Sequence, residues 1–131
     1  MAAVLAEGKT IIKNAAREPE VSDLIECLCQ MGARISGAGT KELLIEGVQE
    51  LNPTSFKIIP DRIETATYLT AVAMTGGNIT IKDSRPDTME SVLDKLREAG
   101  AEITTESDSI NLKMDSSLKS VDISTAPYPL F

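Results

Sequence analysis

The chain repeats part of its own sequence 68 residues later. Gly-Ala-Arg-Ile at residues 32–35 returns as Gly-Ala-Glu-Ile at residues 100–103, and Ala-Val at residues 3–4 returns at residues 71–72. Repetition at a fixed period indicates that one structural unit is used more than once. We therefore expect the chain to fold into copies of a unit that is much shorter than the chain itself.

The first copy has the pattern of a strand, a helix and two further strands. A β-branched run over Lys9–Asn14 predicts the first strand, and apolar residues at helical spacing predict a helix over Glu18–Met31. Two short strands and the turn between them complete the copy, at residues 34–36, 43–45 and Gly37–Thr40. The turn resembles a phosphate loop only in its glycines, because it opens no helix, and we expect a plain hairpin there.

The second copy is complete and predicts the order β-α-β-α-β-β. Its predicted strands lie near Phe56–Ile59, Asn78–Lys82, Glu102–Thr104 and Ile110–Lys113, and its predicted helices span Ile63–Thr75 and Asp87–Ala99. Asp87 and Glu90 have the spacing of a capping box. Glu106–Asp108 is expected to form the turn between the last two strands.

The helix at Ile63–Thr75 is apolar on most of its faces, which is typical of a buried helix. Met1–Gly8 aligns with the last turns of that helix, and Ser120–Ser124 reads as the first strand of a third unit. The pattern thus predicts a segment of a longer protein. The alternative is a natural protein of 131 residues with irregular ends.

Composition excludes several classes of function. The net charge is −7 and the lysines and arginines are scattered, which argues against a nucleic-acid or membrane partner. The chain has no histidine, so a histidine-based triad and histidine-ligated zinc are excluded within it. Cys27 and Cys29 fall on different faces of the predicted helix and cannot easily pair, and free thiols fit a reducing cytoplasm.

Seven stretches resemble a single enzyme family and follow its order. They are Met1–Gly8, Ala15–Glu20, Gly37–Thr40, Pro60–Thr65, Pro86–Thr88, Lys95–Ala101 and Thr125–Pro127. Together they resemble the central part of UDP-N-acetylglucosamine enolpyruvyl transferase (UDP-N-acetylglucosamine 1-carboxyvinyltransferase), which begins peptidoglycan synthesis. The resemblance covers essentially the whole chain.

The resemblance implies an α/β (α+β) fold of the inside-out enolpyruvyl-transferase kind. Six β-α-β-α-β-β units with buried helices form two domains of three units in that family. Residues 1–59 would then end one domain, residues 60–118 would be a complete unit of the second domain with its first strand near residues 56–59, and residues 119–131 would begin a further unit.

The activity implied by the resemblance moves enolpyruvyl from phosphoenolpyruvate to the 3′-hydroxyl of UDP-N-acetylglucosamine and releases phosphate. The resemblance also implies that no metal and no cofactor take part. The family's Lys-Asn pair, its loop with a catalytic cysteine and its late arginine all lie outside this chain, and its catalytic aspartate would follow just after Phe131. No catalytic residue and no complete substrate site can therefore be assigned here, and the chain by itself is expected to be inactive.

Four charged residues remain as candidates for supporting or hinge groups near the cleft between domains. They are Glu18, Glu20, Arg62 and Glu64. The simpler interpretation is that each serves a helix start, where carboxylates interact favourably with the helix dipole.

Two other functions remain open, a stand-alone binding module and the shikimate-pathway enolpyruvyl transferase. Units taken from two domains would leave apolar faces uncovered, so self-association is a further expectation.

Overall fold

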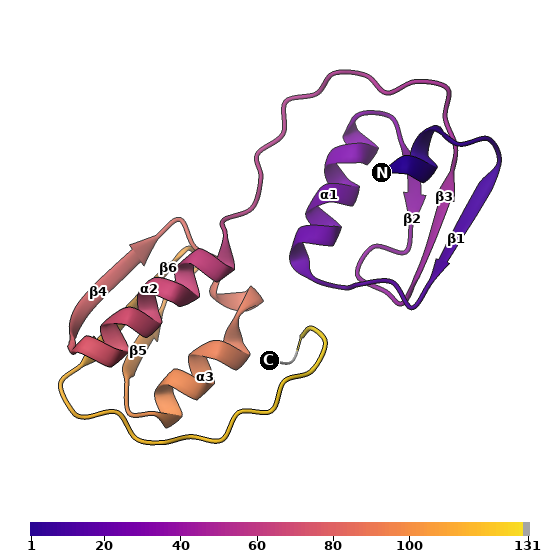
Figure 1. Ribbon diagram of the computed structural model, residues 1–131. Coiled ribbons are helices and arrows are strands. Elements are labelled where there is room, and N and C mark those ends of the chain that lie inside the picture. The colour runs from indigo at the N-terminus through magenta and orange to yellow at the C-terminus, as the bar shows by residue number, and fades with distance from the viewer. Residues whose placement is uncertain (130–131) are drawn as a thin grey trace. The chain divides into compact units, whose positions relative to one another are not determined.

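The computed structural model describes residues 1–129 and divides the chain into two compact units. Unit 1 is Met1–Ile59 and unit 2 begins at Pro60. Each unit has its own three-stranded antiparallel sheet with helices packed on it (Figure 1). The α/β fold class is confirmed by these two sheets and their helices. The assignment of the units to two separate domains of a larger protein stays a prediction.

Unit 1 consists of a short helical turn, one α-helix and three strands. Its elements are η1 (Ala2–Leu5), β1 (Lys9–Lys13), α1 (Pro19–Gln30), β2 (Arg34–Ser36) and β3 (Glu42–Glu46). Strand β3 lies in the centre of the sheet, in the order β1-β3-β2. Val4, Leu28, Ala33 and Ile45 form a small buried cluster between the helical elements and the sheet.

Unit 2 adds a long helix to the same plan. Its elements are α2 (Arg62–Thr75), β4 (Gly77–Lys82), η2 (Pro86–Thr88), α3 (Glu90–Glu98), β5 (Glu102–Thr105) and β6 (Ser109–Met114). Strand β6 is central, in the order β4-β6-β5. This order repeats that of unit 1, as the 68-residue period predicts.

The repeat extends to the backbone at the helix ends. Gly32 after α1 and Gly100 after α3 have φ values of 103° and 107°, a conformation that glycine adopts without steric penalty. The next residue in each copy donates its N–H back into the helix, from Ala33 to Leu28 at 2.9 Å and from Ala101 to Leu96 at 3.0 Å. The same local sequence therefore ends both helices in the same way.

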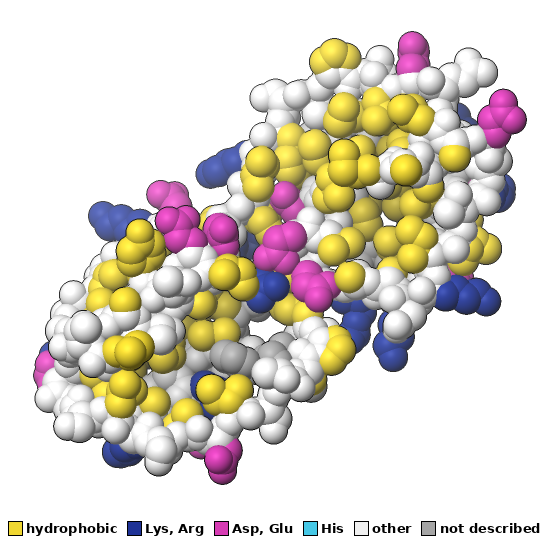
Figure 2. All heavy atoms as spheres, in the orientation of Figure 1, with side chains coloured by type: hydrophobic (Ala, Val, Ile, Leu, Met, Phe, Trp, Pro, Cys, Tyr) yellow, Lys and Arg dark blue, Asp and Glu magenta, His cyan; other side chains and the backbone are white. Residues whose placement is uncertain are grey.

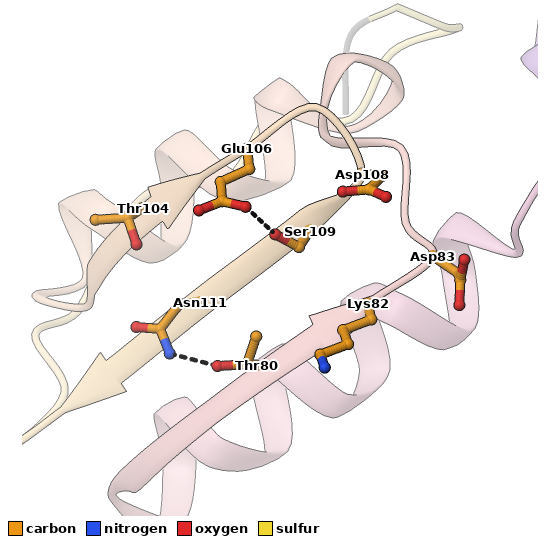
Figure 3. Close-up of a pocket in the computed structure, with 8 residues that line it drawn as sticks. All are labelled: Thr80, Lys82, Asp83, Thr104, Glu106, Asp108, Ser109 and Asn111. Carbon is orange, nitrogen blue, oxygen red and sulfur yellow. Dashed lines mark hydrogen bonds between the residues drawn. The ribbon is translucent and has the colours of Figure 1, made fainter.

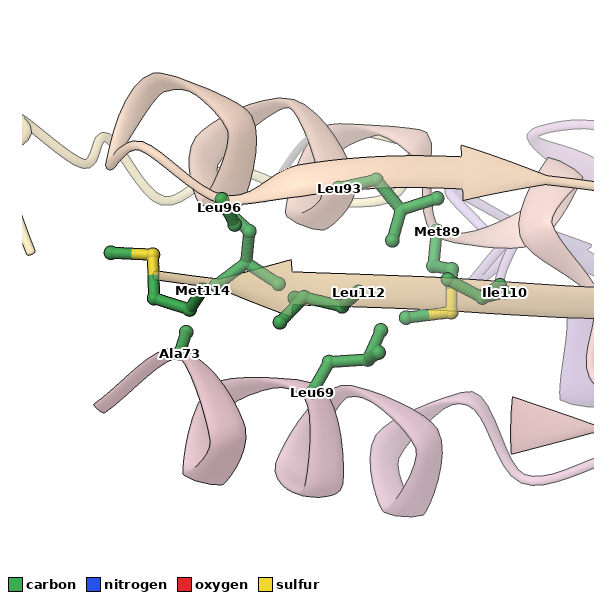
Figure 4. Close-up of a cluster of buried hydrophobic side chains, with 9 residues drawn as sticks. Leu69, Ala73, Met89, Leu93, Leu96, Ile110, Leu112 and Met114 are labelled. Atoms are coloured by element: carbon green, nitrogen blue, oxygen red, sulfur yellow. The ribbon is translucent and has the colours of Figure 1, made fainter. Parts of the chain in front are cut away.

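The core of unit 2 lies between its sheet and the two helices (Figure 4). Its nine buried members are Leu69, Ala73, Met89, Leu93, Leu96, Ala101, Ile110, Leu112 and Met114. Leu69 and Ala73 of α2 face the inward side chains of β6, and Leu93 of α3 reaches the same strand. Both helices cover one face of the sheet, because alternate residues of β6 are buried on that side.

Helix α2 is buried on one face within its unit. Thr65, Leu69 and Ala73 are covered, whereas Ile63 and Met74 are 60% and 70% exposed. Figure 2 shows further apolar side chains on the visible surface of the chain. The sequence predicts that α2 is buried on most of its faces. The contacts within unit 2 bury only one of them. Self-association through these faces stays a prediction.

Two predicted strands are wrong. Phe56–Ile59 and Ser120–Ser124 have no strand assignment in the structure and run as extended chain. A strand needs a neighbour for its N–H and C=O groups, and the described ladders are β1-β3-β2 and β4-β6-β5 without these segments. The predicted segment 119–131 is described up to residue 129, and its last two residues lie outside the described part of the chain.

The start of one helix and the type of another also differ from the prediction. Asp87 lies in η2 and α3 begins at Glu90, so Asp87 and Glu90 form no capping box. Asp87 is engaged by Arg85 instead, with Nε to Oδ1 at 2.8 Å and Nη2 to Oδ2 at 2.7 Å. Within Met1–Gly8 the structure has the single turn η1 in place of regular α-helix.

Both predicted hairpin turns are present. Thr40 Oγ1 accepts the N–H of Glu42 at 3.2 Å, and Gly37 has a φ of 90°. A Cβ at Gly37 would come within 2.1 Å of the Glu42 carbonyl oxygen, which explains the glycine. In unit 2 the Glu106 N–H donates to the Ser109 carbonyl oxygen at 2.9 Å. Neither turn opens a helix, so Gly37–Thr40 is not a phosphate loop.

Candidate functional site

Glu18 and Glu20 lie at the start of α1 in unit 1. Glu18 occupies the N-cap position, but its side chain makes no capping hydrogen bond, and Pro19 begins the helix. The Glu18 backbone carbonyl takes the N–H of Val21 at 2.9 Å. The Glu18 carboxylate is therefore not employed in starting the helix, whereas Glu20 in the first turn has the place that favours the helix dipole.

One oxygen of the Glu18 carboxylate is buried and has no hydrogen-bond partner in the structure. Burial of an unpartnered carboxylate oxygen is unfavourable, and such groups in native proteins call for an explanation. A partner from outside the described residues would supply one. This feature distinguishes Glu18 from an ordinary helix-start residue.

Arg62 and Glu64 lie in the first turn of α2 in unit 2. The residue that caps this helix is Asp61, whose Oδ1 accepts the N–H groups of Ile63 at 2.8 Å and Glu64 at 3.0 Å. Sequence reasoning passed over Asp61, although an aspartate just before an apolar helix is a recognised cap signal. Because its carboxylate occupies two of the free donors, this helix end does not offer an open anion site.

Arg62 lies over the ring of Tyr128, with its Cζ 5.4 Å from the ring centroid. This distance is within the range of a cation–π interaction. Tyr128 comes from the segment after β6, far from Arg62 in the sequence, and no sequence signal links the two residues. The structure thus gives Arg62 a specific contact that a general hinge assignment does not include.

A second arginine of unit 2 is fixed by a carboxylate. The paired hydrogen bonds from Arg85 hold the pKa of Asp87 below its usual value and raise the pKa of Arg85. Arg85 is therefore oriented by its own ion pair with Asp87.

A concavity of about 350 Å³ lies where α2 begins and β4 ends. Its lining residues are Pro60, Asp61, Glu64, Thr65, Tyr68, Ile81, Lys82 and Asp83. Glu64 thus faces a hollow in unit 2, beside two further carboxylates and one lysine. Excess negative charge makes this hollow unsuited to a phosphate or carboxylate ligand by itself.

A concavity of about 490 Å³ lies on the outer face of the unit 2 sheet (Figure 3). It is lined by Thr80, Lys82, Asp83, Thr104, Glu106, Asp108, Ser109 and Asn111. The Asn111 amide in its floor donates to Asn78 Oδ1 at 2.7 Å and lies 2.9 Å from Thr80 Oγ1. Its lining, too, has more carboxylates than lysines, so it offers no surplus positive charge to an anion.

A third concavity, of about 240 Å³, lies on the sheet of unit 1 and includes Arg34 and Glu46. Lys9 donates to Glu46 at 2.8 Å, and this hydrogen bond lowers the pKa of Glu46 and raises that of Lys9. The three hollows therefore lack the cluster of cations that binding of phosphate requires.

Residues 1–129 contain no group of three or more histidine, cysteine, aspartate or glutamate side chains placed to hold a metal ion. Cys27 and Cys29 are free thiols, and Cys29 Sγ lies 3.8 Å from the Ile35 carbonyl oxygen. Among the helices of this described part, none has the length and apolar character needed to cross a membrane.

The family profile of EPSP synthase (3-phosphoshikimate 1-carboxyvinyltransferase) matches residues 1–131. The chain belongs to this enolpyruvyl transferase family. The enolpyruvyl transferase NikO from Streptomyces tendae has a similar structure, with 21% identity, a TM-score of 0.81 and coverage of 98% of this chain and 32% of that one. EPSP synthase from Acinetobacter baumannii aligns at 21% identity with a TM-score of 0.58, covering 92% of this chain and 29% of that one.

The chain thus spans about a third of the length of these two enolpyruvyl transferases. Membership of the family confirms the predicted class of transferase and the fold of its repeat units. It does not choose between an amino sugar and a shikimate derivative as the acceptor. Glu18, Glu20, Arg62 and Glu64 stay predictions as site residues. The structure brings Arg62 to Tyr128 and Glu64 to a hollow of unit 2, and it leaves Glu18 with a buried, unpartnered oxygen.

Proposed function

We propose that this chain is a segment of an enzyme that transfers enolpyruvyl from phosphoenolpyruvate to the 3′-hydroxyl of UDP-N-acetylglucosamine. The choice of acceptor rests on the resemblance of Ala15–Glu20 and Pro60–Thr65 to the amino-sugar enzymes. The structural observation that supports it is the unpartnered buried oxygen of Glu18, within the first of these stretches. A carboxylate with one buried oxygen that the fold leaves unpartnered is a candidate for positioning a ligand or a neighbouring cation.

The reaction needs cations for the phosphate and carboxylate groups, an acid for the vinyl carbon and a base for the sugar hydroxyl. Two of the three hollows have more carboxylates than cations and the third has one of each, so we assign the cationic and acid–base groups to other parts of the enzyme. Residues 1–59 and 60–118 would then be repeat units of two different domains. The chain by itself would be inactive, and the enzyme that contains it would work in the cytoplasm in peptidoglycan synthesis.

A competition between two acceptors tests the proposal. The full-length protein that contains this segment would receive phosphoenolpyruvate with either UDP-N-acetylglucosamine or shikimate 3-phosphate, and phosphate release would be followed. We expect kcat/KM to favour the amino sugar by at least about 10²-fold, because a hydrogen-bonding site strongly rejects an acceptor that leaves its groups unpaired. The opposite preference would assign the protein to the shikimate-pathway activity, the second candidate, which the family match equally allows.

The role of Glu18 can be tested in the same protein. Glu18→Gln keeps the size of the side chain and removes its charge, and Glu26→Gln does the same at an exposed position of α1. We expect the first variant to lose about tenfold or more in kcat/KM with an unchanged melting temperature, and the second to behave like the wild type. Equal activity of the two variants would remove Glu18 from the site.

The stand-alone binding module makes a different prediction. It requires the isolated chain to bind UDP-N-acetylglucosamine without any turnover. Calorimetric titration of the 131-residue chain with this nucleotide sugar measures the difference directly. Our proposal predicts no saturable binding to the isolated chain, since a complete substrate site needs residues from the rest of the enzyme.

A further inference from the structure

The segment that follows β6 contacts unit 2 at its two ends. Near its start, the N–H of Lys119 donates to the carbonyl oxygen of Ala99 at 3.0 Å, at the end of α3. Within residues 120–129, Val121 and Tyr128 are half-buried and the other residues are exposed. The segment has no helix or strand to hold its shape, so its path depends on these anchors.

Tyr128 is the far anchor, and it contacts a cation. The guanidinium of Arg62 lies over the ring, 5.4 Å from its centroid. Arg62 is the first residue of α2, and the Asp61 cap holds that helix start in place. A positioned arginine therefore meets the aromatic ring.

The repeat shows that the near anchor is a general feature and the far anchor is not. In unit 1 the N–H of Asn52 donates to the carbonyl oxygen of Met31 at 2.7 Å, the counterpart of the bond from Lys119 to Ala99. The chain after Asn52 then runs without an aromatic contact to an arginine among the described residues of unit 1. The ring contact is thus a feature of the second copy.

We propose that Arg62 clamps the Tyr128 ring and so acts as a positioning residue for the chain segment at residues 120–129. A cation over an aromatic face is favourable at modest exposure, and a fixed arginine limits the rotation of the ring. The clamp holds the end of this segment against the start of α2. The expected effect of this clamp on catalysis rests on the proposed function, under which residues 120–129 lead to the reacting groups of the enzyme.

The clamp itself can be tested on the isolated chain without any substrate. The chain has two tyrosines and no tryptophan, so a Tyr68→Phe background leaves Tyr128 as the sole tyrosine emitter. We expect the fluorescence anisotropy of Tyr128 to fall in Arg62→Gln toward that of a freely rotating side chain. Arg97→Gln is the matched control, because Arg97 pairs with Glu90 and Asp94 on α3. Equal anisotropy in the two variants overturns the clamp.

The positioning role is tested in the full-length protein by comparing Tyr128→Phe with Tyr128→Leu. Phenylalanine keeps the aromatic face and should retain activity, whereas leucine should lower kcat by up to about 10²-fold with KM changed less than twofold, because small misplacements of reacting groups are costly. A Tyr128→Leu enzyme with unchanged kcat overturns the positioning role. A wild-type protein that is inactive toward UDP-N-acetylglucosamine refutes the proposed function. In that case the clamp is still tested by the anisotropy measurement.

Discussion

Unit 1 and unit 2 have the same antiparallel sheet and differ in what covers it. In unit 2 the fourteen-residue helix α2 packs against β4 and β6, and nine buried residues form the core. In unit 1 the corresponding place beside β3 is held by the four-residue turn η1, and four buried residues form the cluster. As a result, Ile12 of β1, which pairs with the buried Leu43, is still 41% exposed, whereas Ile79 and Ile81 of β4 pack against the core.

The difference shows which part of the repeat is locally determined. The hairpin and the glycine after the helix recur in both units, because each depends on residues close in sequence. The pairing of the first strand with the central strand also recurs, although its partners lie far apart in the sequence. The size of the buried core depends on a long helix, α2, which precedes the strands of its unit and has only the short turn η1 as its counterpart in unit 1. A unit with the full helix buries more apolar surface and should therefore be the more stable one.

The largest expected effect comes from a substitution that removes the main buried contact of α2. Leu69→Ala deletes a fully buried side chain of α2 and should lower the free energy of unfolding of unit 2 by about 4 kcal/mol. Amide hydrogen exchange resolved by residue should show lost protection in unit 2 and unchanged protection in unit 1. Thr67→Ala, at an exposed position of the same helix, should change stability by less than about 0.5 kcal/mol. Equal loss in both units would show that they unfold together.

A glycine substitution probes the hairpin of unit 1. Gly37→Ala combines a positive φ with a Cβ within 2.1 Å of a carbonyl oxygen, and we expect a loss of about 3 kcal/mol. Gly100→Ala in unit 2 has the same type of φ but no contact nearer than 3.7 Å, so about 1 kcal/mol is expected. Urea unfolding of the two variants measures the difference. Similar losses would mean that backbone strain outweighs the steric clash.

The helix starts of the two units provide a third comparison. Asp61→Ala removes two hydrogen bonds to the α2 backbone and should cost about 1 kcal/mol, whereas Asp61→Asn should retain most of the cap. Glu18→Ala should cost less, since the Glu18 side chain makes no capping bond to α1. Thermal unfolding of the three variants measures these values. A greater loss for Glu18→Ala would show a structural role for its carboxylate.

The smallest effect concerns the surface ion pairs and pH. The pKa of Asp87 is depressed by its hydrogen bonds to Arg85, so the folded state is stabilised above the ordinary value of 3.8 and loses this contribution as pH falls through the lower, folded value. The pair is largely exposed, and a few tenths of a kcal/mol are expected. Carbon-detected NMR titration of Arg85→Gln should return the Asp87 pKa to its ordinary value and leave that of Glu46 in unit 1 depressed. An unchanged Asp87 pKa would contradict the assigned cause.

Part of the fold and less of the site could be predicted from the sequence. The helix over Ile63–Thr75 and the turn at Gly37–Thr40 were predicted correctly, because helical spacing and paired glycines are local signals. Phe56–Ile59 was predicted as the first strand of the second copy, but pairing depends on an available neighbour that a short run of residues does not reveal. Arg62 was singled out by resemblance, whereas its contact with Tyr128 was not predicted, because it joins distant parts of the chain.

The sequence by itself determined the repeat, the order of most elements and the family, since each is recorded in short runs of neighbouring residues. The tertiary structure alone decided which face of α2 is covered, which extended segments find a partner strand and which arginine meets the ring of Tyr128. These outcomes depend on side chains and backbone groups that approach from far along the chain. Their free energy arises from burial and contact in space, which no local pattern of residues specifies.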